Sequence, residues 1–106
     1  MVLTAWSNGK NSFGFKISKY ARDKFFDRNL KTAILELPAK DGFITAETNI
    51  NKASFWNNTC RELISQQIKN WLVQNKLFPW KKHHPPKFKA DKIDSNRFRV
   101  SIEQNK

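Results

Sequence analysis

Cysteine, histidine and the acidic residues are the side chains with which this sequence could do catalytic chemistry. A cysteine nucleophile needs a base within hydrogen-bond reach, and a structural zinc ion needs four ligands. The chain has one cysteine, Cys60, and two histidines, His83 and His84, which are adjacent. These residues match neither a zinc motif nor a catalytic pair. We therefore interpret Cys60 as a small buried hydrophobic residue.

The acidic residues do not form the pattern of a metal-dependent nuclease. Cleavage of a phosphodiester by two metal ions requires several carboxylates that converge on one site. Glu36 and Glu47 fall on or near predicted strands, and Asp23 and Asp27 share a predicted helix face, but none belongs to a ligand motif. We expect Glu36 to be exposed. The glycines form no phosphate-binding loop, so we expect no enzyme activity, no metal and no cofactor.

The excess of positive charge is the strongest functional signal in the sequence. The 106 residues include 20 Lys and Arg against 9 Asp and Glu, which gives a net charge of +11. An anionic partner relieves the self-repulsion of such a chain, and nucleic acid is the commonest partner of this kind. Lysine and arginine bind phosphates, while asparagine and arginine also read base edges. The charge therefore favours a nucleic-acid-binding protein.

Length and composition indicate a single domain over residues 1–106. A chain of this size can bury one modest hydrophobic core. One cysteine excludes an internal disulfide, and no apolar run approaches the length of a membrane span. The first residues lack the features of a signal peptide. We expect a cytoplasmic protein that does not bind membranes.

The elements that must position the basic residues begin with a hairpin. Alternating apolar residues predict strands over 2–6 and 12–17, joined by a turn at Asn8 and Gly9. Gly14 within the second strand indicates a bulge or a close backbone approach. A short basic helix over 19–28 follows, capped by Ser18.

Further strands are predicted over 32–37, 43–48, 87–91 and 97–102, and residues 49–58 are predicted to form a polar loop or a short irregular strand. Thr59 and Glu62 match a capping box, so we expect a helix over 59–75 with Trp71 in the core. Residues 77–86 are rich in proline and predict an irregular connection. This order of elements predicts an α+β fold that is mainly β.

Several segments together resemble a B-three-type pseudobarrel, the DNA-binding domain of plant transcription factors and of the effector parts of certain restriction endonucleases. The segments are Gly14-Phe15-Lys16-Ile17-Ser18, Arg22-Asp23-Lys24-Phe25-Phe26, Ile34-Leu35-Glu36-Leu37-Pro38, Ser54-Phe55-Trp56, Cys60-Arg61-Glu62-Leu63 and Pro85-Pro86-Lys87-Phe88. The resemblance implies an open seven-stranded pseudobarrel flanked by two helices, at about 19–28 and 59–75. It also implies two arms that grip the major groove of double-stranded DNA.

Carried onto this sequence, the first arm comes from the early strands and the second from the loop before the later helix. The nucleic-acid-binding residues that we expect are Asn8, Lys10, Asn11, Lys16, Lys19, Arg22, Asn49, Asn51, Lys52 and Ser54. The lysines would neutralise phosphates, and residues such as Asn51 and Arg22 would read bases.

The leading hypothesis is a sequence-specific module for double-stranded DNA, without catalytic activity. The resemblance implies an isolated recognition module or the recognition domain of a restriction-modification or defence enzyme, with a nuclease fused to it or associated with it. Two alternatives stay open. One is a small toxin-like ribonuclease that uses His83 or His84 as an acid or base. The other is an interaction module that binds an acidic protein.

Overall fold

The computed structural model describes residues 1–9, 11–57 and 61–102. This part of the chain forms seven strands and three helices. Their bounds are β1 Val2–Ser7, β2 Phe13–Lys16, α1 Lys19–Phe25, β3 Thr32–Ala39, β4 Gly42–Asn49, α2 Ala53–Trp56, β5 Glu62–Ile64, α3 Gln66–Gln74, β6 Lys87–Asp94 and β7 Arg97–Ser101.

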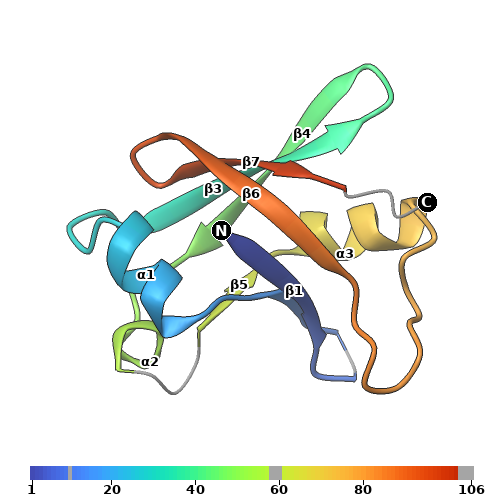
Figure 1. Cartoon of the computed structure of the whole chain (residues 1–106), viewed down its shortest axis with the longest axis horizontal. Coiled ribbons are helices and arrows are strands. Elements are labelled where there is room, and N and C mark those ends of the chain that lie inside the picture. Colours follow the sequence, from blue (N-terminus) through green and yellow to red (C-terminus); the bar gives the residue numbers. More distant parts are fainter. Residues whose placement is uncertain (10, 58–60, 103–106) are drawn as a thin grey trace.

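The strands form one sheet in the order β4-β3-β7-β6-β1-β2-β5. Neighbouring strands are antiparallel, except that β3 and β7 are parallel. The sheet curls into a half-barrel, with α1 and α3 at opposite ends of the molecule in Figure 1. The prediction of an α+β fold that is mainly β, with an open seven-stranded sheet, is therefore confirmed.

The hydrophobic core fills the inside of the curled sheet. Alternate residues of the strands point inward, so that Leu3, Phe15, Leu35 and Phe98 are fully buried. The helix α3 packs against β2 and β4. Trp71 on this helix is only 1% exposed, as predicted, and its indole Nε1 donates to the Pro38 carbonyl oxygen at 2.8 Å.

Gly14 shows why one strand of the hairpin needs a residue without a side chain. A Cβ atom at this position would overlap the backbone carbonyl oxygen of Leu63. The absence of a side chain lets β5 approach β2, where Gly14 faces Ile64 in the ladder. The prediction of a close backbone approach at Gly14 is confirmed.

The prediction of one continuous helix over 59–75 is wrong. Thr59 and Cys60 lie outside the described residues, but Glu62 and Leu63 belong to strand β5 and not to a helix. The helix begins later because Ser65, in an extended conformation, caps it by accepting a hydrogen bond from the Gln67 backbone N–H. As a strand, β5 pairs with β2 and supplies hydrogen-bond partners for backbone N–H and C=O groups of β2.

The first helix is shorter than expected, because it ends at Phe25 and not at residue 28. Phe26 has an extended backbone, and its ring turns into the core against Phe55 and Phe98. The predicted loop at 49–58 also contains a helical turn, α2. None of the helices in the described part of the chain has the length and apolar character that crossing a membrane requires.

Candidate nucleic-acid interface

Two connections between strands lie at the same edge of the molecule, on either side of β2. The first connection, residues 8–12, joins β1 to β2, and the second connection, residues 50–61, joins β4 to β5. Figure 1 shows both along its lower edge, the first connection at the right and α2 of the second at the left. The expected arms therefore come from segments that face the same side of the half-barrel.

The first connection is shaped by its own polar groups. The backbone N–H of Asn8 donates to the Ser12 carbonyl oxygen, and the Asn8 side-chain oxygen accepts from the Ser12 N–H at 3.2 Å. Gly9 supplies the positive φ of +81° that the turn requires. Asn8 and Asn11 are exposed, whereas Lys10 lies outside the described residues.

The second connection is shaped by two contacts within it. The Asn49 side-chain oxygen accepts from the Asn51 N–H at 2.9 Å, which bends the chain as it leaves β4. Further on, the Trp56 indole donates to the Ile50 carbonyl oxygen at 2.9 Å. Asn49 and Asn51 are exposed. Lys52 precedes α2 and Ser54 lies within it, and both are half-buried.

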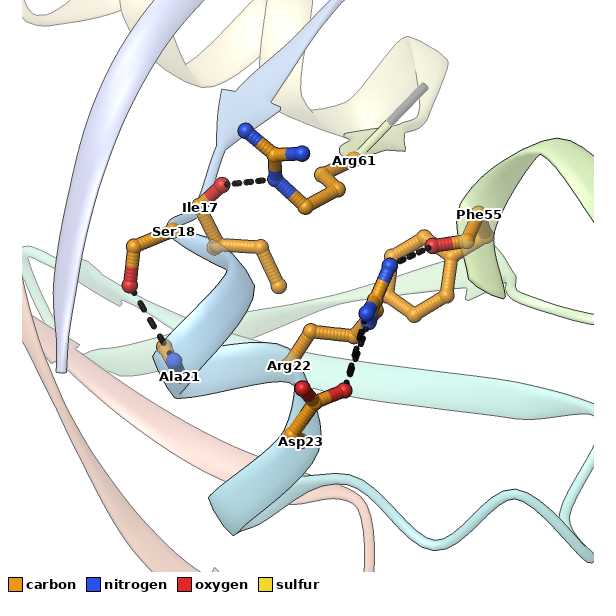
Figure 2. A network of polar contacts seen from close by, with 7 residues as sticks. All are labelled: Ile17, Ser18, Ala21, Arg22, Asp23, Phe55 and Arg61. Atoms are coloured by element: carbon orange, nitrogen blue, oxygen red, sulfur yellow. Dashed lines mark hydrogen bonds and ion pairs between the residues drawn. The ribbon is translucent and has the colours of Figure 1, made fainter. Parts of the chain in front are cut away.

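Two arginines attach the second connection to the segment where β2 leads into α1 (Figure 2). The Arg22 guanidinium donates to the Phe55 carbonyl oxygen at 3.0 Å and pairs with Asp23. Arg61 Nε donates to the Ile17 carbonyl oxygen at 3.1 Å, and the Ile17 N–H donates back to the Arg61 carbonyl oxygen. The second connection is therefore attached at α2 and at Arg61, its last residue.

The position of Arg22 does not agree with the expectation that it reads a base. Only 3% of Arg22 is exposed, and its guanidinium is engaged inside the protein. Long-range packing produces this burial, because Phe55 lies 33 residues further along the chain. We therefore assign Arg22 a role in positioning the second connection and remove it from the set of expected contacts.

Lys16 and Lys19 are exposed, and both lie within two residues of Ile17, whose carbonyl oxygen accepts from Arg61 of the second connection. Paired residues on neighbouring strands point to the same face of a sheet. Thr4 pairs with Lys16 on one side and with Lys87 on the other, so the two lysines share the outer face of the sheet. Lys87 was not among the expected contacts.

The segments that form this edge contain no acidic residue. Residues 1–22, 48–61 and 63–90 include no Asp or Glu, although they contribute twelve lysines and arginines. The intervening Glu62, which is largely buried on β5, pairs with Lys16 in the ladder, so one carboxylate lies beside this lysine. Acidic residues are concentrated instead on the segments 23–47 and 91–106. The connections at this edge therefore carry basic residues and no acidic residue of their own.

A third segment reaches the same edge, although its residues are not among the expected DNA contacts. The third connection, residues 75–86, joins α3 to β6 and carries Lys81, Lys82, His83 and His84, all of them exposed. Its place beside the first connection is visible at the lower right of Figure 1. The lack of acidic residues over 63–90 was a signal in the sequence that could have identified it.

A second polar cluster lies away from this edge, on β3 and β7. Glu36 is only 3% exposed, and its two carboxylate oxygens accept from Arg97 Nε at 2.7 Å and Arg99 Nε at 2.9 Å. The expectation that Glu36 is exposed is wrong, because β7 adds to β3 and places both arginines over it. Burial raises the pKa of Glu36, but the hydrogen bonds and charges of the arginines outweigh it and hold the pKa below its usual value.

The described residues show no arrangement for metal chemistry. Within residues 1–9, 11–57 and 61–102, no group of three or more histidine, cysteine, aspartate or glutamate side chains is placed to hold a metal ion.

Comparison with known proteins does not assign the chain to a family. No family model matches it. No curated protein and no solved structure matches it either.

Proposed function

We propose that this protein is a sequence-specific binding module for double-stranded DNA, and that the first and second connections enter the major groove. The single observation that carries the proposal is that both connections lie along one edge of the molecule, at the two ends of β2, on segments without acidic residues. The resemblance to B-three-type domains agrees with this arrangement of arms. The same resemblance favours a recognition unit that works together with a nuclease.

The lysines at this edge supply the affinity in the proposal. A lysine that contacts a phosphate releases a condensed counterion, so each contact makes binding more sensitive to salt. Lys16 and Lys19 on the β2–α1 segment and Lys87 on β6 are exposed and suited to this role. Phosphate contacts of this kind place the protein on the duplex without reading its sequence.

The asparagines of the two connections supply the specificity in the proposal. An asparagine amide pairs with adenine in the major groove through one donor and one acceptor. Asn11 and Asn51 are exposed, each at a bend between two strands. Because Arg22 and Arg61 fix the second connection, the loop loses little freedom when it binds.

The test is a binding titration with a random-sequence duplex across a series of salt concentrations, with single-stranded and double-stranded RNA beside it. We expect the affinity for DNA to fall steeply with salt, with a slope in log–log form of about −0.9 per phosphate contact. A flat dependence of affinity on salt contradicts the proposal, and so does RNA binding that is as tight as DNA binding or tighter.

Two substitutions separate specificity from affinity once the preferred duplex has been selected from a random pool. We expect Asn51→Ala to relax the preference at one base pair, at a cost of about 1–3 kcal/mol for the preferred base. Lys16→Ala should weaken binding to every duplex by a similar factor. Lys40→Ala, in the turn between β3 and β4, is the matched control and should bind like the wild type. If Asn51→Ala and Lys16→Ala act alike on all sequences, the module is not sequence-specific.

A further inference from the structure

We propose that residues 81–84 of the third connection form a third arm, which contacts phosphates of the same duplex at one flank of the recognised segment. This inference rests on the proposed function. It names a contact element that lies outside the two connections discussed above. We call residues 81–84 the basic turn.

The third connection is attached to the hairpin that carries the first connection. The Phe78 ring packs edge-to-face on Phe13, with ring centroids 4.7 Å apart, and Trp80 packs on Phe78 at 5.4 Å. At its other end, the Pro86 carbonyl oxygen accepts from the Ala5 N–H at 2.9 Å. Both ends of the basic turn are therefore held by β1 and β2, close to the first connection.

The basic turn itself has a defined backbone. The His84 N–H donates to the Lys81 carbonyl oxygen at 2.8 Å, which closes the turn, and His83 has a positive φ of 65°. A loop that is already closed loses less conformational freedom when it contacts a partner than an open one. Aromatic packing at Phe78 and Trp80 thus presents the turn in a fixed place, and not as a loose tail.

The positive charge of the basic turn indicates an anionic partner. Lys81 and Lys82 are exposed, and Lys69 of α3 lies over the Phe13 ring that anchors the connection, with its Nζ 5.5 Å from the ring centroid. No Asp or Glu occurs from residue 63 to residue 90. Lysine is a compact point charge that binds phosphate without reading bases. The basic turn therefore fits the sugar–phosphate backbone and not a base edge.

The experiment compares the double variant Lys81→Ala/Lys82→Ala with the wild type on a long duplex. If each lysine contacts one phosphate, the salt slope becomes shallower by about 1.8, and hydroxyl-radical protection disappears at one flank only. The preferred base sequence should stay the same. The matched control is Lys31→Ala/Lys40→Ala, which removes the same charge from exposed positions at the two ends of β3.

The outcomes distinguish this inference from the proposed function. If the wild type binds DNA and both double variants reduce the salt slope equally, the third arm is wrong, while the DNA-binding module stands. If the Lys81→Ala/Lys82→Ala variant keeps the wild-type slope and footprint, the third arm is also wrong. If the wild type does not bind duplex DNA, the proposed function and the third arm both fail. Phe78→Ala, which releases the anchor and keeps both lysines, should shorten the footprint at the same flank.

Discussion

The edge around β2 and the face of β3 and β7 use basic residues in different ways. On β7, Arg97 and Arg99 lie over the buried carboxylate of Glu36, so their charge is largely compensated within the protein. Around β2, the connections bring lysines together on segments that contribute no acidic residue. The first region gains a tightly joined sheet, whereas the second keeps exposed lysines on segments that have no acidic residue.

The two regions also differ in how they are held. The ladder between β3 and β4 is continuous from Thr32–Asn49 to Ala39–Gly42. The connections around β2 depend on a few single contacts, such as that of Arg22 with the Phe55 carbonyl oxygen. A single substitution should therefore displace a connection far more readily than it separates β3 from β4.

The largest effect is expected from Gly14→Ala, because β2 supports both connections. The added methyl group would overlap the Leu63 carbonyl oxygen, so β2 and β5 must separate. We expect the free energy of unfolding to fall by about 3 kcal/mol, as for severe overpacking. Denaturant unfolding measures this loss. Ser12→Ala in the same hairpin is the control, and a Gly14→Ala protein as stable as the wild type would show that β5 does not approach as described.

A smaller effect is expected from Arg22→Ala. This change leaves the Phe55 carbonyl oxygen without its donor in a buried place, at a cost of about 2 kcal/mol. Under the proposed function, duplex affinity should fall as well, because the second connection is no longer fixed. The salt slope should be nearly unchanged, since Arg22 does not reach a phosphate. Lys24→Ala on the exposed side of α1 serves as the control, and a clearly reduced slope for Arg22→Ala alone would place Arg22 in the interface after all.

The smallest expected effect is the change in protein stability when Glu36 is protonated at acid pH. Its pKa in the folded protein lies below the usual 4.5. The stability that it contributes is therefore complete above the unfolded-state pKa and is lost as the pH falls through the folded-state pKa. Thermal unfolding should show this loss as a fall in Tm in the acid range. Glu36→Gln should lower the Tm at neutral pH and reduce the dependence of the Tm on pH. Duplex affinity should not change, because Glu36 is remote from the connections; a large change in affinity would remove the distinction between the two regions.

Much of the sheet could be predicted because its signals are local. Alternation of apolar residues such as Phe13 and Phe15 identified the strands, and Gly14 identified a close approach. The region around β5 could not be predicted in the same way. Leu63 fits the apolar face of a helix as well as that of a strand, and the capping pattern at Thr59 competes with the cap that Ser65 provides. Pairing with β2, almost fifty residues away, decides between them.

The candidate site was predicted only in outline for the same reason. Exposure of Asn11 and Asn51 follows from their polar turns, which are local features. The burial of Arg22 and of Glu36 depends on partners 33 and 61 residues away, on α2 and β7. Local patterns carry no information about such partners, so the sequence predicts a base contact for Arg22 and exposure for Glu36, both of which are buried.

The strand β7 comes last along the described chain, yet it lies in the middle of the sheet, between β3 and β6. Before it is in place, the strands form two separate groups, β4-β3 and β6-β1-β2-β5, with no ladder between them. During synthesis on the ribosome, the halves must therefore wait for residues 97–101 to emerge. A chain in which β6 has emerged but β7 has not exposes the edges of β3 and β6 at once, and unpaired strand edges are prone to misassembly.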